Sequence, residues 1–161
     1  MKNELIEHKW GGSGIEKKLF EFIIGEFKEG STIIELGSGY CSTKAFSLYY
    51  KTYSIDENSD YINLFKGVNY LHAPKINGWY DRELVKNFLP KKYSLVFIDG
   101  PSGEGNRNGL IQNIDIFNKE ASFIFHDTYR ESEKNLSVEI ARILNRDIKF
   151  YETDDFWAYI K

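Results

Sequence analysis

Cysteine is almost absent from this chain: Cys41 is the only one among 161 residues. One cysteine excludes an internal disulfide and a zinc site built from several thiolates, and it fits a reducing compartment. No apolar run approaches the roughly 18 residues of a membrane span, and the N-terminal segment Met1–His8 is too polar for a signal peptide. These absences predict a cytoplasmic protein without a membrane partner.

An excess of positive charge is also missing. The chain has 21 Lys and Arg against 24 Asp and Glu, a formal net charge of −3, so nothing indicates bulk attraction to nucleic acid. The hydrophobic content of 42% and the charged content of 28% are ordinary for a globular protein. At this length we expect one domain, residues 1–161, with one core and with residues 1–13 as an N-terminal loop or lid.

One stretch organises the rest of the sequence. Thr32–Leu36 is a short β-branched and apolar run, which predicts a buried strand. Gly37 and Gly39 follow it, and a segment with helical spacing begins at Ser42. This order is typical of the nucleotide-binding turn of an α/β sheet, where glycine lets the backbone turn tightly and approach a ligand. Glu35 suits a ligand with a cationic end rather than a pyrophosphate; a turn without any ligand is the alternative.

Periodicity predicts an α/β chain of seven strands, with helices between the first six. The apolar run at residues 93–99 is almost continuous, which is typical of a central parallel strand covered on both faces. The last two strands should form an antiparallel hairpin, so we expect a Rossmann-like three-layer sandwich with a mostly parallel sheet. Ser13 and Asp81 are the expected caps of the first and third helices. The expected strands are residues 32–36, 52–56, 68–74, 93–99, 121–125, 147–151 and 156–160, and the expected helical segments are 15–27, 42–49, 59–61, 81–88, 110–117 and 131–145.

Acidic residues stand at the ends of four expected strands: Glu35, Asp56, Asp99 and the pair His126-Asp127. The carboxyl ends of parallel strands meet at one edge of a sheet, so these groups should converge on one cleft. Asp56 follows the glycine turn by about twenty residues, the spacing at which such folds place a carboxylate on a ribose. A cap for the helical segment 59–61 is the alternative role for Asp56.

These residues resemble the class I S-adenosylmethionine-dependent methyltransferases, and the resemblance covers residues 15–161. The stretch from Glu35 to Gly39, followed by Ser42 and Thr43, is similar to motif I of that family. Asp56 is similar to the acid after the family's second strand. The chain departs from the pattern at Tyr40-Cys41, where a third glycine is common, and at His72-Ala73, where the family often has Asp-Ala.

A narrower resemblance is to the small-molecule and sugar O-methyltransferase branch. It rests on the strand end Phe97-Ile98-Asp99-Gly100-Pro101, on the Gly-Arg loop that contains Arg107, and on Phe125-His126-Asp127. The resemblance implies S-adenosylmethionine as cofactor, with its amino acid end on Glu35 and the glycine turn, its ribose on Asp56 and its adenine near Ala73. The implied cofactor-binding residues are Glu35, Gly37, Ser38, Gly39, Ser42, Asp56, Glu57, Ala73 and Asp99.

The strand-end residues offer two ways to help an acceptor hydroxyl lose its proton. A histidine near its reference pKa of about 6.5 can act as general base at neutral pH, which suits His126 with Asp99 and Asp127 beside it. Alternatively, Asp99 and Asp127 hold Mg²⁺, which lowers the pKa of the hydroxyl. A helix cap with a hydrogen-bonded histidine is the non-catalytic alternative.

Three further residues are candidates for the acceptor site: Arg107, Trp10 and Trp79. Arg107 could pair with a substrate carboxylate, and an exposed loop arginine is the alternative. We expect a methyltransferase acting on a hydroxyl of a small molecule or sugar, with no nucleic-acid partner and with a homodimer left open. The alternatives are an NAD-binding oxidoreductase, against which Glu35 and Ser42 argue, a non-catalytic nucleotide-binding module, and a nucleic-acid methyltransferase.

Overall fold

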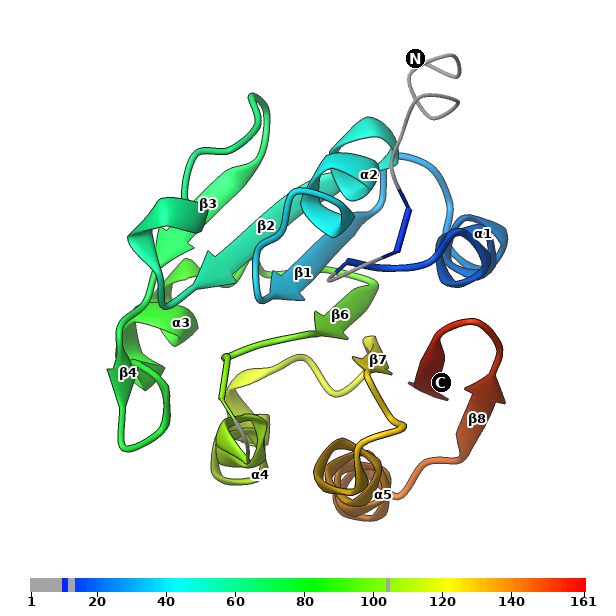
Figure 1. Cartoon of the computed structure of the whole chain (residues 1–161). Coiled ribbons are helices and arrows are strands. Elements are labelled where there is room, and N and C mark those ends of the chain that lie inside the picture. The colour runs from blue at the N-terminus through cyan, green and yellow to red at the C-terminus, as the bar shows by residue number, and fades with distance from the viewer. Residues whose placement is uncertain (1–9, 12–13, 104) are drawn as a thin grey trace.

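A computed structural model describes residues 10–11, 14–103 and 105–161 (Figure 1). Most of the expected N-terminal lid, and Ser13 with it, lies outside the described residues. A seven-stranded sheet has the order β3-β2-β1-β6-β7-β9-β8. The first five of these strands are parallel, while β9 is antiparallel to both β7 and β8. The strands are β1 (Thr32–Leu36), β2 (Lys51–Asp56), β3 (Asn69–His72), β6 (Leu95–Ile98), β7 (Ser122–His126), β8 (Ile148–Glu152) and β9 (Phe156–Ile160).

Helices cover both faces of the sheet, as Figure 1 shows. Two helices pack with one apolar cluster on one face, α1 (Lys17–Glu26) and α2 (Ser42–Tyr49). Three pack with the cluster on the other face, α3 (Arg82–Phe88), α4 (Leu110–Asn113) and α5 (Glu131–Leu144). Along β6, Val96 and Ile98 join one cluster while Leu95 and Phe97 join the other. The near-continuous apolar run of this strand therefore packs into the apolar clusters on both faces of the sheet, which confirms the predicted three-layer sandwich.

A small second sheet was not expected. Residues 75–80, predicted as a loop, form the hairpin of β4 (Lys75–Ile76) and β5 (Trp79–Tyr80). Its two-residue turn is Asn77-Gly78, with φ of 54° and 87°. Asn-Gly is the strongest short sequence signal for such a turn, because both positions need positive φ. The signal was therefore present in the sequence, but the strands that flank it are only two residues long.

The helix ends differ in part from the predictions. Asp81 caps α3 as expected, since its side chain accepts hydrogen bonds from the backbone N–H groups of Glu83 and Leu84. The first helix begins at Lys17 with Glu16 at the N-cap position. The helix expected over residues 110–117 ends at Asn113 and continues as a 3₁₀ turn over Ile114–Ile116. In the part of the chain that the structure describes, no helix has the length and apolar character needed to cross a bilayer.

Candidate functional site

A cavity of about 1020 Å³ opens at the carboxyl ends of the parallel strands. It lies where the strand order reverses, between β1 and β6, which is the usual ligand site of an open α/β sheet. Its walls are the glycine turn after β1, the loop after β6, the end of β7 and the turn between β8 and β9. Asp56, Asp99 and Asp127 line it together. The convergence of strand-end acids that the sequence predicts is therefore present for these three.

Asp56 joins the end of β2 to the glycine turn. Its Oδ2 accepts a hydrogen bond from the Ser38 N–H at 2.8 Å, and its Oδ1 accepts one from the Asn58 N–H at 2.7 Å. Burial raises the pKa of this carboxyl, while the two backbone donors oppose the rise. The cap of the 3₁₀ segment Ser59–Tyr61 is Asn58, whose side chain accepts from the Asp60 N–H. The helix-cap alternative for Asp56 is therefore wrong.

Glu35 lies beneath the glycine turn and not on the cavity wall. Its side chain is fully buried, and its Oε2 accepts hydrogen bonds from Thr43 Oγ1 at 2.7 Å and Ser54 Oγ at 2.6 Å. Thr43 Oγ1 in turn accepts from the Gly39 N–H at 2.9 Å. Desolvation raises the pKa of Glu35 to about 7 in spite of these donors. The direct ligand contact expected for Glu35 is corrected. In this structure its carboxylate binds Thr43 and Ser54, and through Thr43 it holds the backbone of the glycine turn in place.

The two glycines of the turn have different surroundings. Gly37 has φ of +94°, and a Cβ built there would lie 2.8 Å from the carbonyl carbon of Asp99. Its lack of a side chain therefore lets the turn pack against the end of β6, and Gly37 also lies on the cavity wall. Among the described residues, a Cβ on Gly39 would meet only Ser42 Oγ, at 3.2 Å. Since Gly39, Ser38 and Ser42 also line the cavity, Gly39 is where the backbone is open to a ligand.

Glu57 and Ala73 lie in different places relative to the cavity. Glu57 is on the wall, where its Oε1 accepts hydrogen bonds from the N–H of Ser102, at 2.9 Å, and from the hydroxyl of Ser102. It thereby ties the end of β2 to the loop after β6. Ala73 is fully buried in the core and is absent from the described cavity lining. The predicted adenine contact of Ala73 is corrected, because apolar side chains around the residue cover it.

Neither tryptophan proposed for the acceptor site lines the cavity within the described residues. Trp79 is 2% exposed and packs against Tyr80 and Phe117, with ring centroids 5.5 Å and 6.4 Å away. Trp10 packs against the buried Phe20 of α1, with centroids 5.2 Å apart. Both predictions are corrected, since these indoles contribute to apolar packing. Of the two described residues of the N-terminal segment, Trp10 and Gly11, the second lies on the cavity wall.

His126 is held between two carboxylates. Its Nδ1 lies 3.0 Å from Asp99 Oδ1, and its Nε2 lies 2.8 Å from Asp155 Oδ1. Burial lowers the pKa of the ring, but Asp99 and Asp155 outweigh this effect and raise it to about 10. Both ring nitrogens therefore carry protons and donate, and at neutral pH the side chain is an imidazolium. The general-base prediction for His126 is corrected, because a protonated ring has no lone pair to accept a proton.

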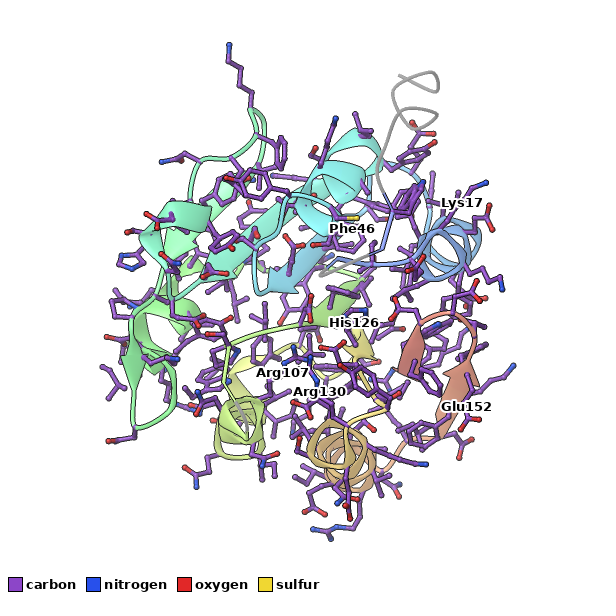
Figure 2. All side chains as sticks on the ribbon, viewed as in Figure 1. Lys17, Phe46, Arg107, His126, Arg130 and Glu152 are labelled. Atoms are coloured by element: carbon purple, nitrogen blue, oxygen red, sulfur yellow. The ribbon has the colours of Figure 1, made fainter. Side chains whose placement is uncertain are left out.

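Arg107 is buried beside this histidine. Its Nη2 donates to Asp99 Oδ1 at 2.9 Å and to Asp127 Oδ2 at 3.2 Å, and its Nη1 donates to the backbone oxygen of His126 at 3.2 Å. Arg130 adds a contact of 3.0 Å from Nη1 to Asp127 Oδ2. Figure 2 shows Arg107, His126 and Arg130 gathered around the ends of β6 and β7. Arg107 reaches the cavity but is neither an exposed loop residue nor free for a substrate carboxylate, so that prediction is corrected.

The sequence reasoning missed several residues of this network, above all Asp155 and Arg130. Asp155 stands in the turn before β9, and antiparallel pairing places Trp157 of β9 opposite His126 of β7. Strand pairing thus brings the Asp155 carboxylate to the His126 ring. Nothing in the turn sequence Thr153-Asp154-Asp155 predicts this contact. Ser54 and Thr43, which hold Glu35, are likewise identified only by their contacts.

No family model and no curated protein matches the sequence. Solved structures do resemble it. An rRNA methylase from Streptococcus thermophilus aligns over 89% of this chain and 93% of its own, with 10% identity and a TM-score of 0.60. The C-terminal domain of precorrin-6Y C5,15-methyltransferase from Rhodobacter capsulatus aligns over 94% and 90%, with 12% identity and a TM-score of 0.59.

A third similar structure is MycE methyltransferase from the mycinamycin biosynthetic pathway, in complex with Mg, SAH and mycinamycin VI. It aligns over 99% of this chain but 52% of its own, with 11% identity and a TM-score of 0.62. Because an rRNA methylase is also among the matches, the comparisons do not support the predicted lack of a nucleic-acid partner. Sequence identities this low are evidence for the fold alone. The chain has the Rossmann-like fold that these methyltransferases share.

Proposed function

We propose that this protein transfers a methyl group from S-adenosylmethionine to a hydroxyl of a small molecule or sugar. The observation that carries the proposal is the hydrogen bond from the Ser38 N–H to the Asp56 carboxylate. It holds this carboxylate near Gly39, whose backbone is open to a ligand, at the edge of the sheet where the strand order reverses. The fold shared with methyltransferases supports the same assignment. The cavity volume of about 1020 Å³ is at the upper end for small-molecule sites, which leaves room for a cofactor and an acceptor.

The cavity residues fit S-adenosylmethionine in charge and in shape. Its ribose has two neighbouring hydroxyls, and the lone pairs of Asp56 that the backbone donors leave over can accept from them. Its ammonium and sulfonium are cationic, and the described lining is rich in acids: Glu16, Asp56, Glu57, Asp99, Asp127, Asp154 and Asp155. When bound, the cofactor supplies an electrophilic methyl group. These seven acids outnumber the four basic residues of the same lining, Lys44, Arg107, His126 and Arg130, which favours a small acceptor over the phosphate backbone of a nucleic acid.

Asp127 is the residue that we assign to the acceptor hydroxyl. His126 is protonated and cannot take a proton. Asp127 accepts from Arg107 and Arg130 at Oδ2, which leaves its Oδ1 to accept from a hydroxyl. Asp127 lines the cavity, and its backbone has φ of 62°, a left-handed conformation of the kind that clusters at functional sites. Tyr129 and Phe156 line the cavity beside it and offer exposed aromatic faces to a ring or sugar.

The same network does not fit Mg²⁺. Asp99 and Asp127, the two carboxylates proposed as ligands, are already bridged by Arg107, and the ring nitrogen of His126 that faces them carries a proton. The proposed reaction therefore proceeds without a metal. The protein's part is to hold the acceptor in line with the methyl group and to receive or orient the hydroxyl proton.

Calorimetry with S-adenosylmethionine and with NAD tests the proposal. The wild-type protein should bind the first and not the second, and Asp56→Asn should weaken binding by about 10- to 100-fold, the loss expected for hydrogen bonds to a charged group. Asp60→Asn is the matched control, because Asp60 is an exposed acid of the next segment that does not line the cavity. Preference for NAD, or equal effects of the two substitutions, would refute the proposal.

A further inference from the structure

The ends of β6 and β7 place three potential ligands around one point. Asp99, His126 and Asp127 each offer one oxygen or nitrogen atom, and these atoms lie within 4.8 Å of one another. Ligand atoms around one divalent cation have similar separations, because each lies roughly 2.0–2.6 Å from the ion. The backbone thus provides the geometry of a cation site, with two carboxylates facing each other across it.

An arginine bridges the two carboxylates of this group. Arg107 comes from the 3₁₀ turn η3 (Asn106–Gly109) in the loop after β6, and its side chain is 8% exposed. One nitrogen, Nη2, donates to both carboxylates, at 2.9 Å to Asp99 and 3.2 Å to Asp127. A single positive group between two carboxylates neutralises them and sets their spacing, which is what a bridging cation would do. The guanidinium remains charged at every accessible pH.

The rest of the site holds Arg107 in place. Its Nη1 donates to the buried backbone oxygen of His126 at 3.2 Å, so withdrawal of the side chain would leave that oxygen without this donor. Two arginines, Arg107 and Arg130, face the two carboxylates of Asp99 and Asp127, so their charges balance. A divalent cation added to this balanced and largely buried set would be an uncompensated charge.

We infer that the guanidinium of Arg107 takes the place of a divalent cation between Asp99 and Asp127, so that the site holds no metal. This inference adds to the proposed methyl transfer. It rests on that proposed function, because the proposed reaction is what would use the bridged carboxylates. Arg107 is then a positioning residue: its hydrogen bond holds the Asp127 carboxylate in place at the cavity wall. Its removal should uncover a metal site that the wild-type protein lacks.

Titration of the cofactor-free protein with Mn²⁺, followed by electron paramagnetic resonance, tests this directly. Wild-type protein should leave Mn²⁺ free at millimolar concentration, whereas Arg107→Ala should bind it at least about tenfold more tightly. The double variant Arg107→Ala with Asp127→Asn should lose that gain, because a carboxylate ligand becomes a neutral amide. Arg107→Lys is the matched control, since it keeps a positive charge at this position and should bind no Mn²⁺.

Two results would overturn the inference. One is binding of Mn²⁺ by the wild-type protein that Asp127→Asn abolishes, a measurement that does not depend on how any Arg107 variant folds. The other is a folded Arg107→Ala protein, judged by circular dichroism, that binds Mn²⁺ no better than wild type. Failure of the proposed function is separate: if calorimetry finds no S-adenosylmethionine binding while the Mn²⁺ pattern holds, the cation replacement stands and the assigned reaction falls.

Discussion

The first prediction concerns the protonation of His126 and its effect on stability. The pKa of this imidazolium is about 10, against 6.5 for an ordinary histidine, a difference that corresponds to about 5 kcal/mol of favourable interaction in the charged form. Because the pKa in the folded state is the higher one, this stabilisation is fully present below pH 6.5 and is lost as pH rises through 10. We therefore expect the free energy of unfolding to fall across this range by at most about 5 kcal/mol from this group.

Nuclear magnetic resonance of protein labelled with ¹⁵N-histidine measures the pKa directly. The chain has three histidines, so the spectrum is simple, and His72→Gln assigns His72, which is exposed at the end of β3. At pH 7.5 both ring nitrogens of His126 should show the chemical shifts of a protonated imidazolium. Asp155→Asn keeps a hydrogen-bond acceptor near Nε2 but removes its charge, and should lower the pKa of His126 by about 1 to 3 pH units.

Asp154→Asn is the matched control for that substitution. Asp154 is the neighbouring residue, its side chain is 68% exposed, and it pairs with Lys18 at 2.8 Å instead of with the ring. It should leave the histidine titration where it is. A neutral His126 at pH 7.5 in the wild-type protein would refute the reasoning and return this residue to the role of general base.

Two other predictions concern the glycine turn. Glu35 has its pKa raised from 4.5 to about 7, so the neutral form is favoured on folding: the associated stability is fully present below pH 4.5 and lost as pH rises through 7. In chemical denaturation, Glu35→Gln should remove this pH dependence, worth about 3 kcal/mol, and an unchanged slope would contradict the burial of its charge. Gly39→Val should abolish S-adenosylmethionine binding in calorimetry with little change in melting temperature, whereas Gly37→Ala should lower the melting temperature, because its Cβ would meet the backbone of Asp99. The reverse pattern would show that Gly37, and not Gly39, faces the ligand.

Regular elements and the position of the cavity could be predicted because they depend on local patterns. The apolar runs of β1 and β6 reflect strands that are covered on both faces, since successive side chains point to opposite faces of a sheet. Parallel strands bring their carboxyl ends to one edge, so Asp56, Asp99 and Asp127 meet there whatever the loops between them do. The Asn77-Gly78 turn was predictable in the same way, since its signal is two residues long.

What each charged residue does at that edge was decided by the tertiary structure alone. Asp155 reaches His126 only because β9 pairs antiparallel with β7, and this contact together with that of Asp99 makes an expected base a cation at neutral pH. Arg107 reaches Asp99 and Asp127 from a loop whose sequence is equally compatible with exposure. A pKa depends on the distance to other charges and on the exclusion of water, and both are set by residues far along the chain. The sequence by itself therefore determined which groups come to the cavity, while the packing around them determined which carry a proton, which are paired and which face a ligand.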